Sequence, residues 1–270
     1  MIKYYFLIFF FFLLGCTSLT IYQPTGINEI PEVSSGGPGN SFDIEGDNGY
    51  EYTAINDASR RPPRWDPSVK AANGLADGIA GRIRFPFENK KTELLLGGYA
   101  VGVFGIFKYQ FVGPHFFQAK KGDFSLAFLT KISSSLTIPK SGSQDGLFGS
   151  GGNPWEAKIN ANGIDGSLIA GYRAKDDLLF YTGGLVSAST ITAHIKQKVS
   201  DDGKDQGGDY DFGDHVQRSG PVLGVLFQIS QRASLHIEGT YLKTNFSQPG
   251  LSLDPQTNAA ANFRIDLDRP

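Results

Sequence analysis

A histidine and a glutamate two residues apart, His236 and Glu238, come nearest to catalytic chemistry by residue type and spacing. A general base needs an orienting partner and a nucleophile within hydrogen-bond reach, and Ser234 completes the pattern Ser-x-His-x-Glu. Residues i and i+2 of a strand share a face but lie about 7 Å apart. This separation is too long for a hydrogen-bonded triad, so we expect no enzyme activity, no catalytic residue and no cofactor.

Charged residues with the same two-residue spacing occur in three places along the chain. The set is Arg82, Arg84, His236, Glu238, Arg264 and Asp266. If the three segments are neighbouring strands of a closed barrel, these side chains meet inside it, where charges have to be paired. We interpret them as an interior polar network that fills the lumen. Two alternatives stay open: a narrow polar path or small-ligand site, and a solvent-facing set on a soluble barrel.

The spacing of apolar residues indicates which elements carry these charges. Leu223, Val225 and Phe227 alternate with small or polar residues, and the same period recurs from Leu75 onward. Side chains of a strand point alternately to opposite faces, so this period predicts strands. Eight are expected, at residues 75–87, 94–118, 123–137, 160–173, 178–199, 215–230, 234–246 and 259–268. The predicted fold is all-β, an eight-stranded antiparallel up-and-down β-barrel over residues 75–270.

The lengths of the connections predict two different ends for this barrel. Successive connections of a meander lie at alternate ends, so the short ones, 119–122, 174–177 and 231–233, fall together. Short turns at one end and long loops at the other are typical of bacterial outer-membrane barrels. Both ends of the barrel chain are expected on the short-turn, periplasmic side, where a lipid in the inner leaflet would lie.

The segment 94–118 is too long for one spanning strand of about 9–11 residues, and Gly113-Pro114 interrupts it. Pro cannot donate to a ladder and Gly marks a bend, so we interpret the segment as one long, bent strand. The alternative is two strands, which would change the strand count and exchange the two ends for part of the chain.

The first sixteen residues predict export. Lys3 precedes an apolar run from Tyr4 to Leu14, which has the make-up of a secretory signal and is too short for a transmembrane helix. We expect residues 1–15 to be a signal peptide and residues 16–74, which are rich in Pro and Gly, to be a disordered periplasmic linker. Cys16 is the only cysteine, so disulfides and cysteine metal sites are excluded.

The residues Leu13-Leu14-Gly15-Cys16 resemble a bacterial lipobox, Leu-x-Gly-Cys. The resemblance implies that lipoprotein-processing machinery removes the signal and attaches a diacylglycerol to Cys16, which becomes the first residue of the mature protein. The next residue is Thr17. It is not the Asp that retains many enterobacterial lipoproteins in the inner membrane, so the resemblance favours the outer membrane.

Residues 75–268 resemble a small eight-stranded outer-membrane barrel of the OmpA type in strand number, alternation and loop asymmetry. The final strand, from Ala261 to Leu267, resembles the C-terminal signal that the barrel-assembly machinery reads. The resemblance implies a place in the outer membrane of a Gram-negative bacterium, with outer-membrane lipids and that machinery as partners. Outer-membrane lipid A deacylases are similar in architecture, but their His-x-Ser-Asn motif does not occur in this chain.

An acidic stretch, residues 201–214, has the composition of a loop that could wrap Ca²⁺. It contains six Asp among glycines, and carboxylate oxygens are the ligands that Ca²⁺ prefers. The order Asp209-x-Asp211-x-Gly213-Asp214 does not fit an EF-hand loop, and the twelfth-position Glu is missing. We interpret the stretch as a solvated acidic loop and expect no metal site, with calcium binding as the open alternative.

Composition limits the possible functions. The net charge of −2 gives no overall field that would attract nucleic acid. The 34 Gly, 21 Phe and 11 Tyr residues suit a barrel with a crowded interior and an aromatic exterior. We expect a monomeric, lipid-anchored outer-membrane barrel with a structural or surface-interaction role.

Two other functions stay open. The first is a soluble lipidated barrel that binds a small apolar ligand, with Leu223, Val225 and Phe227 pointing inward. The second is an outer-membrane barrel enzyme that acts on lipid.

Overall fold

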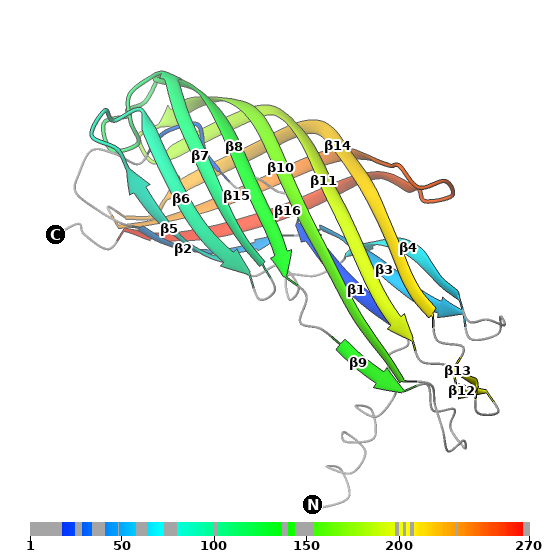
Figure 1. Ribbon diagram of the computed structural model, residues 1–270. Helices are drawn as coiled ribbons and strands as arrows, with labels where there is room; N and C mark the ends of the chain where they lie inside the picture. The colour runs from blue at the N-terminus through cyan, green and yellow to red at the C-terminus, as the bar shows by residue number, and fades with distance from the viewer. Residues whose placement is uncertain are drawn as a thin grey trace, which may run out of the picture.

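The computed structural model describes an all-β protein (Figure 1). It covers residues 18–24, 29–33, 41–47, 49–57, 64–72, 80–99, 102–136, 140–143, 154–197, 200–201, 204–205, 208–230 and 232–266. Every regular element in these ranges is a strand, and every pairing is antiparallel, which confirms the predicted class. Within the same ranges, no helix is long and apolar enough to cross a membrane.

Ten strands follow one another around a closed sheet. The sheet runs β11-β14-β15-β16-β2-β5-β6-β7-β8-β10-β9, and β10 also pairs with β11. Since β9 (Lys140–Ser143) only adds to β10, the other ten strands form a cycle. They are β2 (Ser41–Asp47), β5 (Ala80–Pro86), β6 (Thr92–Tyr99), β7 (Gly102–Val112), β8 (Phe124–Leu136), β10 (Pro154–Lys175), β11 (Leu178–Gln197), β14 (Gly208–Gln228), β15 (Ala233–Phe246) and β16 (Leu253–Asp266).

The expected count of eight strands is not confirmed, for two reasons. The segment 94–118 contains two strands, β6 and β7, which pair with each other from Thr92↔Tyr109 to Tyr99↔Gly102. The region expected to be a disordered linker supplies the other extra strand, because β2 lies between β16 and β5. The expectation of a linker that stays outside the barrel is therefore wrong for residues 41–47.

Three more strands of the same region form a separate small sheet. β3 (Gly49–Asp57) and β4 (Arg64–Ala72) are a hairpin, and β1 (Ser18–Pro24) pairs with β3 from Ser18↔Ile55 to Pro24↔Gly49. A two-stranded pair, β12 (Ser200–Asp201) and β13 (Lys204–Asp205), lies in the connection between β11 and β14. The expected signal peptide, residues 1–15, and Cys16 lie outside the described residues.

The barrel has two different ends. The connections 87–91, 113–123, 176–177 and 229–232 meet at one of them, which we call the short-turn end; β16 also finishes there. The opposite end, which we call the long-connection end, carries 48–79, 100–101, 137–153, 198–207 and 247–252. The connections predicted to lie together, 119–122, 174–177 and 231–233, fall at the short-turn end. The division of 94–118 into two strands brings the connection 87–91 to the same end, although an eight-stranded meander would place it opposite them.

Strand length is uneven around the barrel. β10, β11 and β14 have 22, 20 and 21 residues, whereas β2 and β5 have 7 each. β8 pairs with β10 only as far as Asn160, and β15 pairs with β14 only as far as Val216. Beyond these points, residues 154–159, 193–197 and 208–215 extend past their shorter neighbours at the long-connection end. We call these three segments the projecting part.

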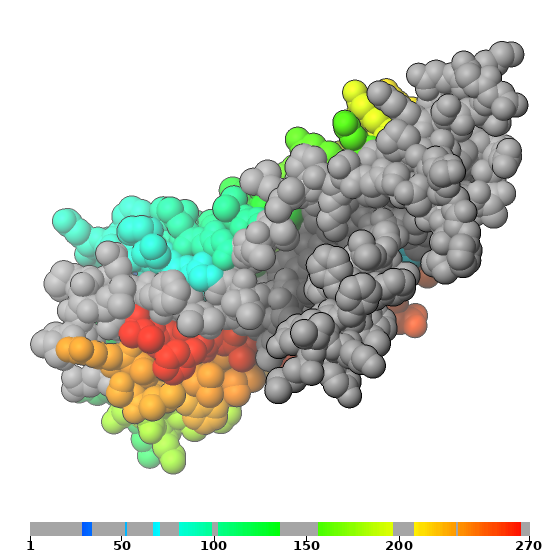
Figure 2. Space-filling view, turned by 90° about the horizontal axis from the view of Figure 1, so that it is seen from below, coloured from blue at the N-terminus to red at the C-terminus, as the bar shows by residue number. Residues whose placement is uncertain are grey.

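The two faces of the barrel wall differ in chemistry. Leu223 is 62% exposed and Phe227 43%, and both point outward. Along β5, Ile83 and Phe85 are exposed, while Arg82 and Arg84 between them are buried. The arrangement expected for a soluble barrel with an apolar interior, in which Leu223, Val225 and Phe227 point inward, is therefore wrong for Leu223 and Phe227. Figure 2 shows one stretch of this outer surface, with β5 and β6 in cyan and β16 in red.

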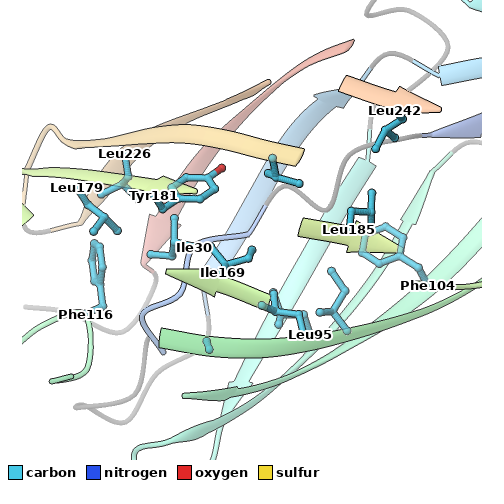
Figure 3. Packing of buried hydrophobic residues seen from close by; sticks show 14 residues of the cluster. Ile30, Leu95, Phe104, Phe116, Ile169, Leu179, Tyr181, Leu185, Leu226 and Leu242 are labelled. Carbon is cyan, nitrogen blue, oxygen red and sulfur yellow. The ribbon is translucent and has the colours of Figure 1, made fainter. Parts of the chain in front are cut away.

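Apolar packing inside the molecule forms two clusters. The first fills the barrel and includes Ile30, Leu95, Phe104, Tyr181 and Leu226 (Figure 3). The second lies in and near the projecting part, where Tyr52 of β3 packs among Ala157, Ile159, Ala193 and Ile195. The small sheet therefore covers the inner face of the projecting strands, and the charged side chains lie with the first cluster.

Candidate functional site in the barrel lumen

A five-residue segment, Glu29–Val33, lies inside the barrel although the sequence predicted a linker there. All five residues are buried, with Glu29 and Val33 at 0% exposure. Ile30 belongs to the apolar cluster of the lumen and lies near Tyr181 and Ile169 in Figure 3. We call Glu29–Val33 the plug segment. It supplies the lumen with two carboxylates, which the strand alternation alone did not reveal.

Glu29 is the centre of the interior charge network. Its Oε1 accepts from Arg82 Nη1 at 2.6 Å and from Arg84 Nη2 at 2.8 Å. Its Oε2 accepts from Arg84 Nη1 at 3.0 Å and from Lys108 Nζ at 2.9 Å. The Arg84 contact is bidentate, which is the strongest geometry for a guanidinium and a carboxylate. One carboxylate of the plug segment thus joins three cations from β5 and β7.

Glu93 of β6 supplies the second carboxylate of this network. Its Oε2 lies 2.7 Å from Lys108 Nζ and 3.6 Å from Arg84 Nη1. All of these side chains are at most 4% exposed. Removing charges from water costs several kcal/mol per ion, and only close pairing repays it. Three cations and two carboxylates at these distances therefore form one unit, in which each charge depends on the others.

Further contacts fix the rest of the plug segment. Arg173 of β10 donates from Nε to Glu32 Oε1 at 3.0 Å and from Nη2 to Oε2 at 2.5 Å. The backbone N–H of Val33 donates to Gln110 Oε1 at 2.8 Å, and its carbonyl accepts from Phe116 N at 2.9 Å. Because Glu29 binds β5 and β7 while Glu32 binds β10, the plug segment crosses the lumen from wall to wall.

A neighbouring trio joins β11 to β15. The Tyr181 hydroxyl donates to Glu238 Oε2 at 2.9 Å and also contacts His236 Nε2. A hydroxyl can donate only one hydrogen bond. Because the Tyr181 hydroxyl donates to Glu238, its oxygen accepts a hydrogen bond from the Nε2–H of His236. All three residues are at most 4% exposed. His236 thus contacts Tyr181 of β11, across the intervening strand β14, in place of the Ser234 nucleophile considered from sequence.

Aromatic rings close the short-turn end of the lumen. Phe116, in the connection between β7 and β8, is 2% exposed. The guanidinium carbons of Arg173 and Arg264 each lie 5.0 Å from the centre of its ring. Cations at this distance from a ring face are attracted by its quadrupole. Arg264 therefore lies inside as predicted, and it packs on a ring at this end.

The structure places five of the six predicted network residues in the lumen. These five are Arg82, Arg84, His236, Glu238 and Arg264, all buried. For Asp266 the structure describes only the backbone, which pairs with Ser41. Sequence reasoning missed Glu29, Glu93 and Lys108. Charge balance is the signal that could have indicated the two carboxylates, because the inward positions of the predicted strands held more cations than carboxylates; it could not have indicated Lys108, which is a cation.

The acidic stretch 201–214 is not one loop. β14 begins at Gly208, so Asp209 and Asp211 are exposed on one face of a strand while Asp214 is buried on the other. The Asp214 carboxylate accepts from Ser247 N at 2.8 Å and from Ser247 Oγ at 2.6 Å. Asp211 pairs with His194 across the strands. Among the described residues, no group of three or more His, Cys, Asp or Glu is placed to hold a metal ion.

Comparisons with known proteins give no family for this chain. No protein-family model matches it, and no curated protein matches it. The solved structures that resemble it include the toluene transporter TodX of Pseudomonas putida, with 14% identity and a TM-score of 0.28 over 87% of this chain and 69% of that one.

Two further structures have similar values. One is OmpT, an outer membrane protein of Vibrio cholerae, with 10% identity and a TM-score of 0.21 over 94% of this chain and 99% of that one. The other is the toluene transporter TbuX of Ralstonia pickettii, with 11% identity and a TM-score of 0.22 over 90% and 93%. TM-scores this low give no information about the function of this chain.

Proposed function

We propose that the chain is a lipid-anchored outer-membrane β-barrel that spans the membrane with its own wall, is closed by its plug segment and has a structural or surface-interaction role. The observation that carries the proposal is the polarity of the wall. Large apolar side chains point outward, while Arg, Lys, Glu and His point inward and are buried. A soluble protein has the reverse arrangement, and a barrel in lipid has this one.

The apolar exterior of β10 is tall enough to cover most of a bilayer core. On β10 the large outward apolar residues are Tyr172, Leu168 and Ile164, and Asn162 is the next outward residue but polar. At about 3.3 Å per residue and a strand tilt of about 40°, Ile164 to Tyr172 covers roughly 20 Å along the membrane normal, most of the ~25 Å apolar band of outer-membrane barrels. The band therefore begins near the short turn 176–177 and ends before the projecting part.

An aromatic row marks the edge of this band at the short-turn end. Phe124 pairs with Tyr172, and Tyr172 pairs with Phe180 on the next strand. All three side chains are about half exposed. Aromatic girdles at both interfaces are a property of membrane barrels, so this row supports the orientation of the barrel axis along the membrane normal.

The projecting part supports a surface role. Its outward residues are polar, and they include Glu156, Lys158, His194, Lys196 and Asp211. At about 3.3 Å per residue, the 22-residue β10 is roughly 70 Å long, far more than a bilayer needs. A polar extension on the side of the long connections is available to other molecules, whereas the plug segment closes the lumen.

A variant that lacks the lipid site but keeps all barrel strands tests this proposal. The Cys16→Ala variant is expected to stay with the membrane pellet after carbonate extraction, because the barrel holds itself in lipid. Incorporation of labelled palmitate into the wild type, and its absence from the variant, checks that Cys16 carries the acyl group. Release of the variant into the supernatant would overturn the membrane-spanning barrel, and equal palmitate incorporation would overturn the lipid site.

A further inference from the structure

The N-terminal stretch of the chain runs through the barrel from one end to the other. Val33 lies at the short-turn end, because its carbonyl accepts from Phe116 in the connection 113–123. Arg173, the partner of Glu32, lies three residues before the short turn 176–177. The strand β2 then starts at Ser41, which pairs with Asp266 at the finishing end of β16. Residues 29–33 and the start of β2 are thus tied to the short-turn end.

β1 is tied to the opposite end. It pairs with β3 along its whole length, with Ile21 opposite Tyr52. Tyr52 packs among Ala157, Ile159 and Ile195 of the projecting part, and its ring stacks on Phe212 at 6.2 Å. β1 is therefore held at the long-connection end, on the inner side of the projecting strands (Figure 1).

The direction of β1 decides where the N-terminus emerges. Pro24 pairs with Gly49, which follows the last residue of β2 by two positions, whereas Ser18 pairs with Ile55 near the tip of the β3–β4 hairpin. From Ser18 the chain therefore runs inward toward the wall and then into the lumen. Cys16 precedes Ser18 by two residues, and two residues span at most about 7 Å. This reach is too short to return Cys16 to the short-turn end.

We propose that the N-terminus, with the lipid at Cys16, emerges on the long-connection side of the membrane, which is the outer face, and that the chain then threads its own barrel. The proposal rests on the proposed membrane-spanning function. It replaces the sequence-based expectation that both ends of the chain lie on the short-turn side with the lipid in the inner leaflet. The C-terminal strand still ends at the short-turn side, so the two ends of the chain lie on opposite sides.

Cysteine labelling in intact cells tests this topology. Cys16 is the only cysteine, and the proposed lipid would block its thiol, so single substitutions give clean signals. Ser18→Cys reports the N-terminus, Ser252→Cys the connection 247–252, and Asp177→Cys the short turn; the last two positions are exposed. With a membrane-impermeant maleimide, positions 18 and 252 are expected to be labelled in intact cells and position 177 only after lysis. Labelling after denaturation gives the total for each variant.

The outcomes separate the two proposals. If position 252 is labelled in intact cells while positions 18 and 177 are labelled only after lysis, the threaded topology is overturned and the membrane-spanning barrel stands. Labelling of position 177 in intact cells, with 18 and 252 protected, overturns the assignment of the outer face. Equal labelling of 252 and 177 shows that the barrel does not cross the membrane, so both proposals fail. An epitope inserted between Thr17 and Ser18, probed with antibody on intact cells, gives a second reading if β1 shields the thiol.

Discussion

At the scale of single residues, one carboxylate decides whether the lumen is stable. Glu29 accepts hydrogen bonds from Arg82, Arg84 and Lys108, and all four side chains are buried. The Glu29→Ala variant leaves these cations short of a counter-charge, and removing one partner of a buried pair costs about 3–5 kcal/mol. A urea titration of the barrel refolded in lipid vesicles measures the loss. Glu156→Ala, on the exposed outer face of β10, is the control and is expected to change stability by less than about 0.5 kcal/mol.

A glycine gives room to the Tyr181 ring. A Cβ at Gly224 would lie 2.0 Å from Tyr181 Cζ and 2.1 Å from its hydroxyl oxygen. The ring cannot move aside without losing its contacts with His236 and Glu238. The Gly224→Ala variant is therefore expected to lose about 1–3 kcal/mol, as overpacked cores do.

Another glycine provides the matched control for that substitution. A Cβ at Gly184, on the outer face of the neighbouring strand β11, meets nothing within 4 Å. The Gly184→Ala variant is expected to unfold at the same urea concentration as the wild type. Equal midpoints for both glycine variants would mean that the Tyr181 ring has room to shift.

At the scale of elements, the outer wall of β10 provides a test of depth in the membrane. Leu168 lies near the middle of the apolar band and is about half exposed, while Asn162 lies on the same face beyond the band. Arg at the midplane of a membrane barrel costs about 2–4 kcal/mol, and near the interface only about 0–1 kcal/mol. Leu168→Arg is therefore expected to lower the free energy of unfolding in vesicles far more than Asn162→Arg. Equal losses at both positions would place the bilayer elsewhere on the wall.

The strands differ in how well the alternation of apolar residues predicted them. Alternation on β5, β15 and β16 predicted both the strands and their charged inner face. It failed on residues 94–118, because Leu94, Leu95 and Leu96 are consecutive apolar residues and give no parity. Gly113-Pro114 was interpreted as a bend within a strand, but it lies in the connection after β7. The connection between β6 and β7, residues 100–101, has no Pro to mark it.

The prediction missed β2, the first strand of the barrel, for a different reason. β2 carries Phe42 and Ile44 in alternation with Asp43 and Glu45, which is the period of a strand. The Pro and Gly residues around it led to the linker interpretation, because composition over a long window outweighed a seven-residue pattern. Glu29 lies in the same Pro- and Gly-rich region and was missed as well. Its position is set by ion pairs with residues 53 to 79 positions away, and no local pattern encodes them.

At the scale of the whole molecule, the position of the plug segment inside the barrel constrains how the ring of strands can close. The plug segment precedes β2 in the chain, and β2 pairs with the C-terminal strand β16. The ring therefore closes only when the last strand reaches β2, and the plug segment has to be inside by then. Its ion pairs with β5, β7 and β10 form between segments that precede β16 in the chain. The described ion pairs at Glu29 therefore include no residue of β16, the strand that completes the ring.

We expect the plug segment to determine whether the barrel conducts ions. The wall of the lumen carries charged groups, and Glu29–Val33 occupies the space between β5, β7 and β10 with contacts on each. Replacing residues 29–33 by a Gly-Ser segment of equal length removes both carboxylates and the apolar Ile30 while keeping the chain connected. The wild type is expected to be silent in planar bilayers, whereas the replacement conducts small ions, with a preference for anions because Arg82, Arg84 and Lys108 lose Glu29. Val33→Ala alone, which keeps both carboxylates and the backbone contacts, should stay closed. Equal conductance in the wild type and the replacement would show that the plug segment does not seal the lumen.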